Sequence, residues 1–140
     1  MKTNRLAQVN IDFILTFIVI LSIFLALTYA SSLKYTQMNY ETKENSAELL
    51  ATKLATNINS IYLVGNGAKK EVLFPPTLID NTEYTMTIYP TEQLVEIVYF
   101  FENQNRSYSY PLLTNNISGK TSNIFNTINI TNIDGGILIE

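Results

Sequence analysis

The chain contains few kinds of side chain that could catalyse a reaction or bind a metal. Its 140 residues include no histidine and no cysteine, so imidazole bases, thiol nucleophiles and the usual zinc ligands are all missing. The acidic residues Asp80, Glu83, Glu92 and Glu96 do not follow the spacing of a metal-binding loop. We therefore expect a protein that is not an enzyme and that has no catalytic residue, no metal site and no cofactor.

Two other features bear on ligand binding. Gly65–Gly67 (Gly-Asn-Gly) lacks the longer glycine motif and the following Lys-Ser/Thr of a phosphate loop, so we interpret it as a turn between a helix and a strand. The formal net charge is −3, whereas nucleic-acid binding depends on clustered Lys and Arg. We therefore expect no nucleic-acid partner.

Three Asn-x-Ser/Thr triplets could accept an N-linked glycan if the chain is exported. They begin at Asn105, Asn116 and Asn129. The sequence around Asn116 is rich in Asn, Ser and Thr and is typical of a loop, so among the three we expect Asn116 to be the favoured glycan acceptor. Because the chain is Asn-rich, such triplets also arise by chance.

An uncharged apolar block, Phe13–Ala30, must position everything that precedes and follows it. Its 18 residues include no Gly or Pro. As a helix the block would extend roughly 27 Å at ~1.5 Å per residue, close to the ~30 Å hydrocarbon core of a bilayer. Lys2 and Arg5 precede it, and positive residues on one flank favour keeping that end in the cytoplasm. The block predicts a membrane segment whose C-terminal side leads outward.

The helix is expected to continue well past the apolar block. From Ser31 to Tyr62 there is no Pro or Gly, and the pattern becomes amphipathic, with Lys43, Glu44, Glu48 and Lys53 on the other face. We expect one long helix over 8–62 whose second half packs on a domain. The apolar residues that recur at spacings of three and four are Ala47, Leu50, Ala51, Leu54, Ile58, Ile61 and Tyr62.

The rest of the chain, residues 63–140, predicts a small antiparallel β-sheet head domain, so the fold class is α+β. Period-2 alternation and β-branched or aromatic residues indicate the strands. A short connection at Pro90–Glu92 and a turn at Asp134–Gly135 separate neighbouring strands, and Leu113–Asn123 is expected to be a loop. The predicted strands are Glu71–Phe74, Tyr84–Tyr89, Leu94–Phe101, Arg106–Pro111, Ile124–Ile130 and Gly136–Ile139.

A single acidic residue lies at the start of the apolar block. Asp12 directly precedes Phe13 and follows Gln8 by four residues. A carboxylate beside hydrocarbon is unfavourable unless a donor pairs with it. If the chain were cleaved before Gln8, the new amine of a neighbouring copy could neutralise Asp12.

At these residues the chain resembles a known family. The segment Arg5–Phe13 looks like the class III signal peptide of archaeal type IV pilin-like proteins, in which a prepilin peptidase cuts before a Gln and an acid follows four residues later. The resemblance implies cleavage between Ala7 and Gln8, a leader over 1–7, and an assembly charge pair of Asp12 with the amine of Gln8. The family usually has Gly before the cut and Glu at the acid position, where this chain has Ala7 and Asp12.

The resemblance extends more weakly to Leu54–Gly67, Leu73–Pro75 and Ile130–Ile139, which are similar to parts of archaeal pilin head domains. It implies a major or minor subunit of a cell-surface filament, with residues 13–30 in the filament core. It also implies other pilin subunits and a prepilin peptidase as partners, and a membrane before assembly. Removal of Lys2 and Arg5 would change the formal charge from −3 to −5.

Two other interpretations of the N-terminus stay open. The apolar block is compatible with an uncleaved signal anchor that carries an extracytoplasmic β domain, which binds a ligand or partner without polymerising. It is also compatible with a secretory signal peptide cut before Ser31, after Thr28-Tyr29-Ala30. The many aromatic residues of the predicted strands are interpreted mainly as core and surface residues, with exposed members available for adhesion or subunit contacts.

Overall fold

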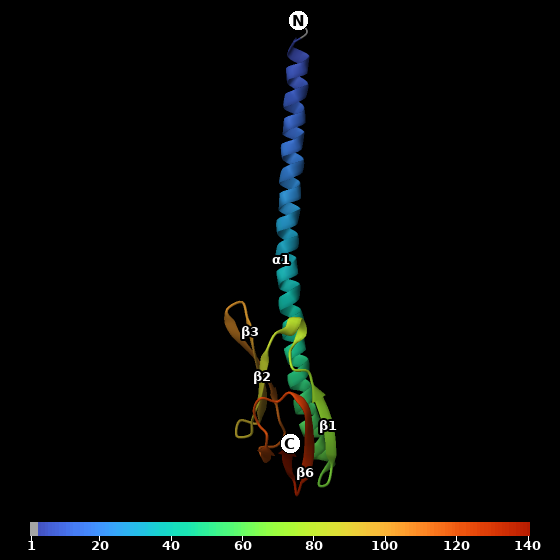
Figure 1. The fold of residues 1–140 in the computed structure, drawn as a ribbon, viewed down its shortest axis with the longest axis vertical. Helices are drawn as coiled ribbons and strands as arrows, with labels where there is room; N and C mark the ends of the chain where they lie inside the picture. Colours follow the sequence, from blue (N-terminus) through green and yellow to red (C-terminus); the bar gives the residue numbers. More distant parts are fainter. Residues whose placement is uncertain (1–2) are drawn as a thin grey trace. The chain divides into compact units, whose positions relative to one another are not determined.

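The computed structural model describes the backbone of residues 3–140 and the side chains of residues 11–140 apart from Asp80. It contains two compact units, Met1–Tyr40 and Glu41–Glu140; we call the second the head unit. One long helix followed by small, mainly antiparallel sheets confirms the predicted α+β class (Figure 1). The head unit includes the last part of the helix as well as the β-rich residues 63–140.

Helix α1 spans Thr3–Val64. It ends two residues beyond the expected Tyr62, directly before the predicted turn at Gly65–Gly67. Gly65 adopts a left-handed φ of 97° that a residue with a side chain rarely adopts. The amide of Gly65 still donates to the carbonyl of Ile61 at 3.3 Å, and the amide of Ala68 then donates to the carbonyl of Gly65 at 3.2 Å. These bonds cap the helix and turn the chain into the first strand.

The C-terminal part of α1 forms one wall of the hydrophobic core, with strands gathered around it (Figure 1). The predicted face is confirmed, and Ala55 belongs to it as well. Tyr62 is partly buried and packs against the same core. The buried residues of this face are Ala47, Leu50, Ala51, Leu54, Ala55, Ile58 and Ile61.

The strands form two sheets rather than the single sheet that was predicted. One sheet has the order β1-β6-β7-β5 and the other the order β2-β3-β4. Strand β3 is central in its sheet, as its β-branched and aromatic residues indicated. The elements are β1 (Lys69–Phe74), the short 3-10 helix η1 (Ile79–Asn81), β2 (Tyr84–Tyr89), β3 (Leu94–Phe101), β4 (Gln104–Pro111), β5 (Ile117–Gly119), β6 (Asn126–Ile133) and β7 (Gly136–Ile139).

The predicted loop Leu113–Asn123 is wrong in one part, because it contains β5. This three-residue strand pairs in parallel with β7, a partner distant in sequence, so no local alternation marks it. The predicted strand Ile124–Ile130 is displaced and becomes β6, which runs from Asn126 to Ile133. Strand β6 pairs antiparallel with both β1 and β7, and these two partners determine its bounds.

The segment between β5 and β6 connects the two sheets. The amide of Ile88 donates to the carbonyl of Thr121 at 2.7 Å, and the amide of Ile124 donates to the carbonyl of Met86 at 3.2 Å. Both bonds lie along the side of β2 that β3 does not occupy. This edge of the sheet is therefore partly paired, which reduces the unpaired backbone that an edge strand exposes.

One buried polar side chain, Asn132 of β6, ties the end of α1 to the β6–β7 hairpin. Its Nδ2 donates to the carbonyls of Ile61 at 3.2 Å and Tyr62 at 3.4 Å. Its Oδ1 accepts from the amide of Gly135 at 3.0 Å. A side chain that is 1% exposed thus has partners for both its donor and its acceptor atoms.

Candidate assembly segment and head surface

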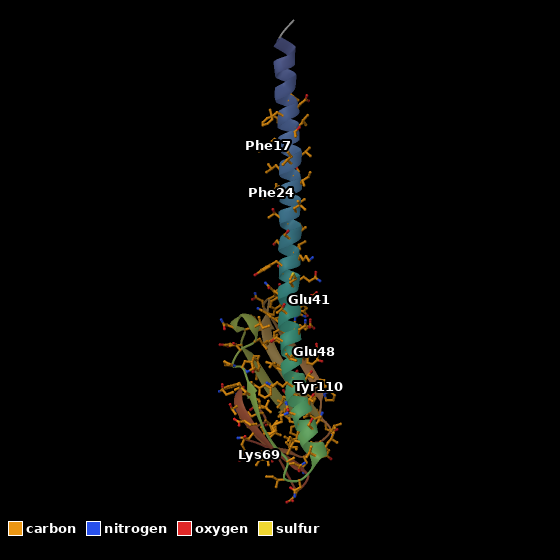
Figure 2. All side chains as sticks on the ribbon, turned by 90° about the vertical axis from the view of Figure 1, so that its right-hand side faces the viewer. Phe17, Phe24, Glu41, Glu48, Lys69 and Tyr110 are labelled. Carbon is orange, nitrogen blue, oxygen red and sulfur yellow. The ribbon has the colours of Figure 1, made fainter. Side chains whose placement is uncertain are left out.

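The apolar part of α1 exposes its side chains around its whole circumference. Between Ile11 and Leu27, the exposed fractions of the large apolar side chains run from 45% at Leu21 to 71% at Phe13. Phe17 and Phe24 are among those that project outward (Figure 2). A helix that is apolar on every face belongs inside lipid or among other helices. The segment could therefore anchor the protein in a membrane, by its length and composition.

The uncharged stretch extends beyond the apolar block Phe13–Ala30. It runs over 21 residues, 13–33, which at ~1.5 Å per residue is about 31 Å of helix. Tyr29 and Tyr35 near its end are each 68% exposed, and Lys34 is the first charge. Tyr and Lys with exposed polar ends are typical of the membrane–water interface. Sequence reasoning overlooked this boundary, although the position of Lys34 marks it.

Hydroxyl groups inside the apolar stretch have partners within the helix. Ser22 Oγ donates to the carbonyl of Ile18 at 2.8 Å, and Thr28 Oγ1 donates to the carbonyl of Phe24 at 2.9 Å. A hydroxyl bonded to the carbonyl one turn earlier can enter an apolar environment without an unsatisfied donor. The stretch thus satisfies these polar groups without a partner chain.

Asp12 lies in α1 at the N-terminal boundary of the uncharged stretch. The hydroxyl of Thr16 donates to the backbone carbonyl of Asp12 at 2.8 Å, which leaves the carboxylate out of that bond. The backbone of Ala7 and Gln8 is helical, but their side chains lie outside the described residues, as do Met1 and Lys2 altogether. The cleavage site and the charge pair between Asp12 and the Gln8 amine therefore stay predictions.

Polar contacts attach the outward face of α1 to the sheets within the head unit. Tyr108 Oη donates to a carboxylate oxygen of Glu48 at 3.1 Å. Desolvation of the phenol, and then the bond to this carboxylate, raise the pKa of Tyr108. Lys53 of α1 contacts two residues of β1: its Nζ donates to the carbonyl of Leu73 at 2.7 Å and lies 5.1 Å from the centroid of the Phe74 ring. Glu48 and Lys53 thus help hold the helix in the head unit.

A surface hollow of about 320 Å³ lies on the sheet β2-β3-β4. Tyr84 forms part of it, and its phenol donates to the carbonyl of Pro75. Burial raises the pKa of Tyr84, because the charged form loses water. The remaining residues that line the hollow are Glu83, Thr85, Val98, Tyr99, Phe100 and Asn105.

Within residues 11–140, Asp80 excepted, no three His, Cys, Asp or Glu side chains are grouped as a metal site would need.

The three glycosylation triplets lie in different surroundings. Asn105 is exposed on β4, and Asn129 is half-buried on β6 between two partner strands. Asn116 is exposed directly before β5, as expected from the sequence, yet its side-chain amide packs over Gly136. The carbonyl of Asn116 also accepts from the amide of Ile137 at 2.8 Å, so this residue is tied to β7 rather than lying in an open loop.

No protein-family model matches the sequence, and no match was found among curated proteins or solved structures.

Proposed function

We propose that the chain is a structural subunit, major or minor, of a surface filament of the archaeal type IV pilus kind. One observation carries the proposal: an uncharged stretch, 13–33, is exposed on every side, and the same α1 continues from it into the head-unit core. A subunit whose helix packs among like helices would bury the whole circumference of this stretch. The resemblance of Arg5–Phe13 to a class III signal peptide supports the same function.

Assembly would begin with a membrane-inserted precursor whose N-terminus is cytoplasmic. Hydrolysis of the Ala7–Gln8 peptide bond removes the leader with Lys2 and Arg5 and frees the amine of Gln8. The apolar stretch then leaves lipid for a bundle of like helices, where tight packing replaces lipid contacts. Addition through two unlike surfaces does not close on itself, so it produces a filament rather than a ring.

The spacing of Gln8 and Asp12 gives this assembly an axial register. Four residues of helix correspond to about 6 Å along the axis. A neighbouring subunit displaced by about that distance brings its Gln8 amine level with the Asp12 carboxylate. An unpaired charge in an apolar bundle is strongly unfavourable, so registers that leave either group without a partner are disfavoured.

The first experiment is intact-mass and N-terminal analysis of the protein from its native membranes and cell surface, together with the size of its assemblies in mild detergent. We expect a mature chain that begins at Gln8, or at its cyclised form, in detergent-resistant assemblies of high mass. A monomer that begins at Met1 would favour the anchored β domain that binds a partner without polymerising. A chain that begins at Ser31 would indicate a secreted head. Either result would refute the filament mechanism.

A further inference from the structure

The hairpin β3–β4 presents one glycosylation triplet near its tip. Glu102 and Asn103 connect the strands and have φ angles of 49° and 62°. Two consecutive left-handed residues form the tight turn whose twist matches that of the flanking strands. Asn105 follows this turn by two residues and is exposed on β4, at the edge of its sheet.

The register of the hairpin pairs Asn105 with an exposed aromatic residue. Phe100 is the cross-strand partner of Asn105 and is 58% exposed. Directly opposed residues of an antiparallel pair project from the same face, with Cβ atoms about 5 Å apart. The neighbours Tyr99 and Phe101 turn to the opposite face, where Tyr99 is buried and Phe101 packs against the core.

Phe100 and Asn105 both line the surface hollow described above, which is the right kind of surface for a sugar ring. Thr85 and Val98, which pair with each other across β2 and β3, also line the hollow, and so does Glu83, which carries a carboxylate. An aromatic ring can receive the C–H bonds on the apolar face of a pyranose. Hydroxyl and carboxylate groups beside it can bond to the sugar hydroxyls.

The other two triplets offer a glycan less room. Asn129 belongs to a strand with partners on both sides, and its amide and carbonyl bond to Glu140 at 2.9 Å and 3.0 Å. The Nδ2 of Asn116 lies 2.9 Å from where a Cβ on Gly136 would be. A sugar on that nitrogen would have to displace the amide from its contact with β7.

We propose that Asn105 is an N-glycan acceptor and that the first sugar rests in the adjoining hollow with its apolar face on Phe100. This inference rests on the proposed function insofar as that function places the head unit outside the cell. The donor class is a lipid-linked sugar phosphate. A C–N bond forms between Nδ2 of Asn105 and the anomeric carbon, and the bond from that carbon to the phosphate oxygen breaks. The lipid phosphate leaves with the bonding electron pair, and Nδ2 loses one proton to a base.

The test is mass spectrometry of the full chain isolated from its native cell surface, with Asn105→Gln and, as matched control, Asn116→Gln. We expect an intact mass above that of the polypeptide, with the whole increment lost in Asn105→Gln and retained in Asn116→Gln. Thermal unfolding of Asn105→Gln, with and without Phe100→Ala, then tests the hollow. Loss of the glycan should lower Tm by roughly 4 °C when Phe100 is present and by much less when it is replaced.

An unmodified Asn105, or a glycan carried only by Asn116 or Asn129, would overturn the inference. Equal Tm losses in both backgrounds would overturn the part that concerns Phe100. The same spectra report the N-terminus, so the two proposals fail separately. A chain that begins at Gln8 without a glycan contradicts only the glycan site. A glycosylated chain that begins at Met1 contradicts only the filament.

Discussion

Replacement of Asn132 by Ala should strongly destabilise the head unit. The substitution removes the two bonds from Nδ2 to the carbonyls of Ile61 and Tyr62, and the bond that Oδ1 accepts from Gly135. Each hydrogen bond contributes ~1 kcal/mol net, and a buried group left without a partner costs about 1–3 kcal/mol more. Gly135 is exposed, so water can replace the bond to its amide and only part of this cost applies. We therefore expect a loss of about 3 kcal/mol in the free energy of unfolding.

The assay is thermal unfolding of the full chain in mild detergent, followed by far-UV circular dichroism of the sheet signal. For a unit of about 100 residues, 3 kcal/mol corresponds to a fall in Tm of roughly 15 °C. The matched control is Asn115→Ala. Asn115 is exposed, and its backbone carbonyl accepts from Ile117 at 3.0 Å, a bond that the substitution leaves in place. We expect this control to change Tm by less than roughly 3 °C.

Asn132→Asp separates loss of the donor from loss of packing. The carboxylate keeps the shape and the acceptor for Gly135 but faces the two carbonyls of Ile61 and Tyr62 without a proton. Its pKa should be raised, so the lost stability should be regained as the pH falls and the carboxyl group becomes protonated. Equal Tm values for Asn132→Ala and Asn115→Ala, or a pH-independent Asn132→Asp, would refute the role assigned to this side chain.

Three further outcomes are expected. Asp12→Ala should reduce the yield of assembled filament, measured by electron microscopy, at least roughly tenfold, because a loss of ~1.4 kcal/mol in assembly free energy is a factor of ten. Asp12→Glu should stay close to native, and equal yields of both variants would exclude the charge pair. Because burial raises the pKa of Tyr84 above 10.0, its stabilising contribution is complete below pH 10 and is lost as pH rises through the raised value; Tyr84→Phe should flatten the alkaline fall in Tm, and an unchanged slope would contradict this. Gly119→Ala should lower Tm well beyond Gly67→Ala, since a Cβ at Gly119 would lie 2.1 Å from the carbonyl oxygen of Ile139 whereas Gly67 has open space; similar Tm values would show that β5 can shift.

Local pattern was sufficient for much of the β structure. The bounds of β2, β3 and β7 agree with the sequence, because period-2 alternation is interrupted by Pro90 and by the turn Asp134–Gly135. The core face of α1 was likewise predictable, since its apolar residues recur with the helical period. In both cases the signal lies within one element.

Features that depend on distant partners left no such signal. Asn132 is one of many Asn residues, and its role depends on carbonyls about 70 positions earlier in the chain. Strand β5 exists through its pairing with β7. The opposition of Phe100 and Asn105 requires the register of the hairpin. The uncharged stretch 13–33, in contrast, was largely predictable from composition, although its end at Lys34 was overlooked.

The buried face of α1 also determines how the head unit would respond to pulling. The chain has no cysteine, so a tensile load that enters the head unit at Glu41 meets no disulfide. It acts along the helix axis on a face that is interlocked with the core from Ala47 to Ile61. Those side chains cannot leave their neighbours one at a time without fraying the helix, so the load is shared among them in shear. Mechanical strength in this head unit would therefore come from the length of one packed helix face rather than from a disulfide.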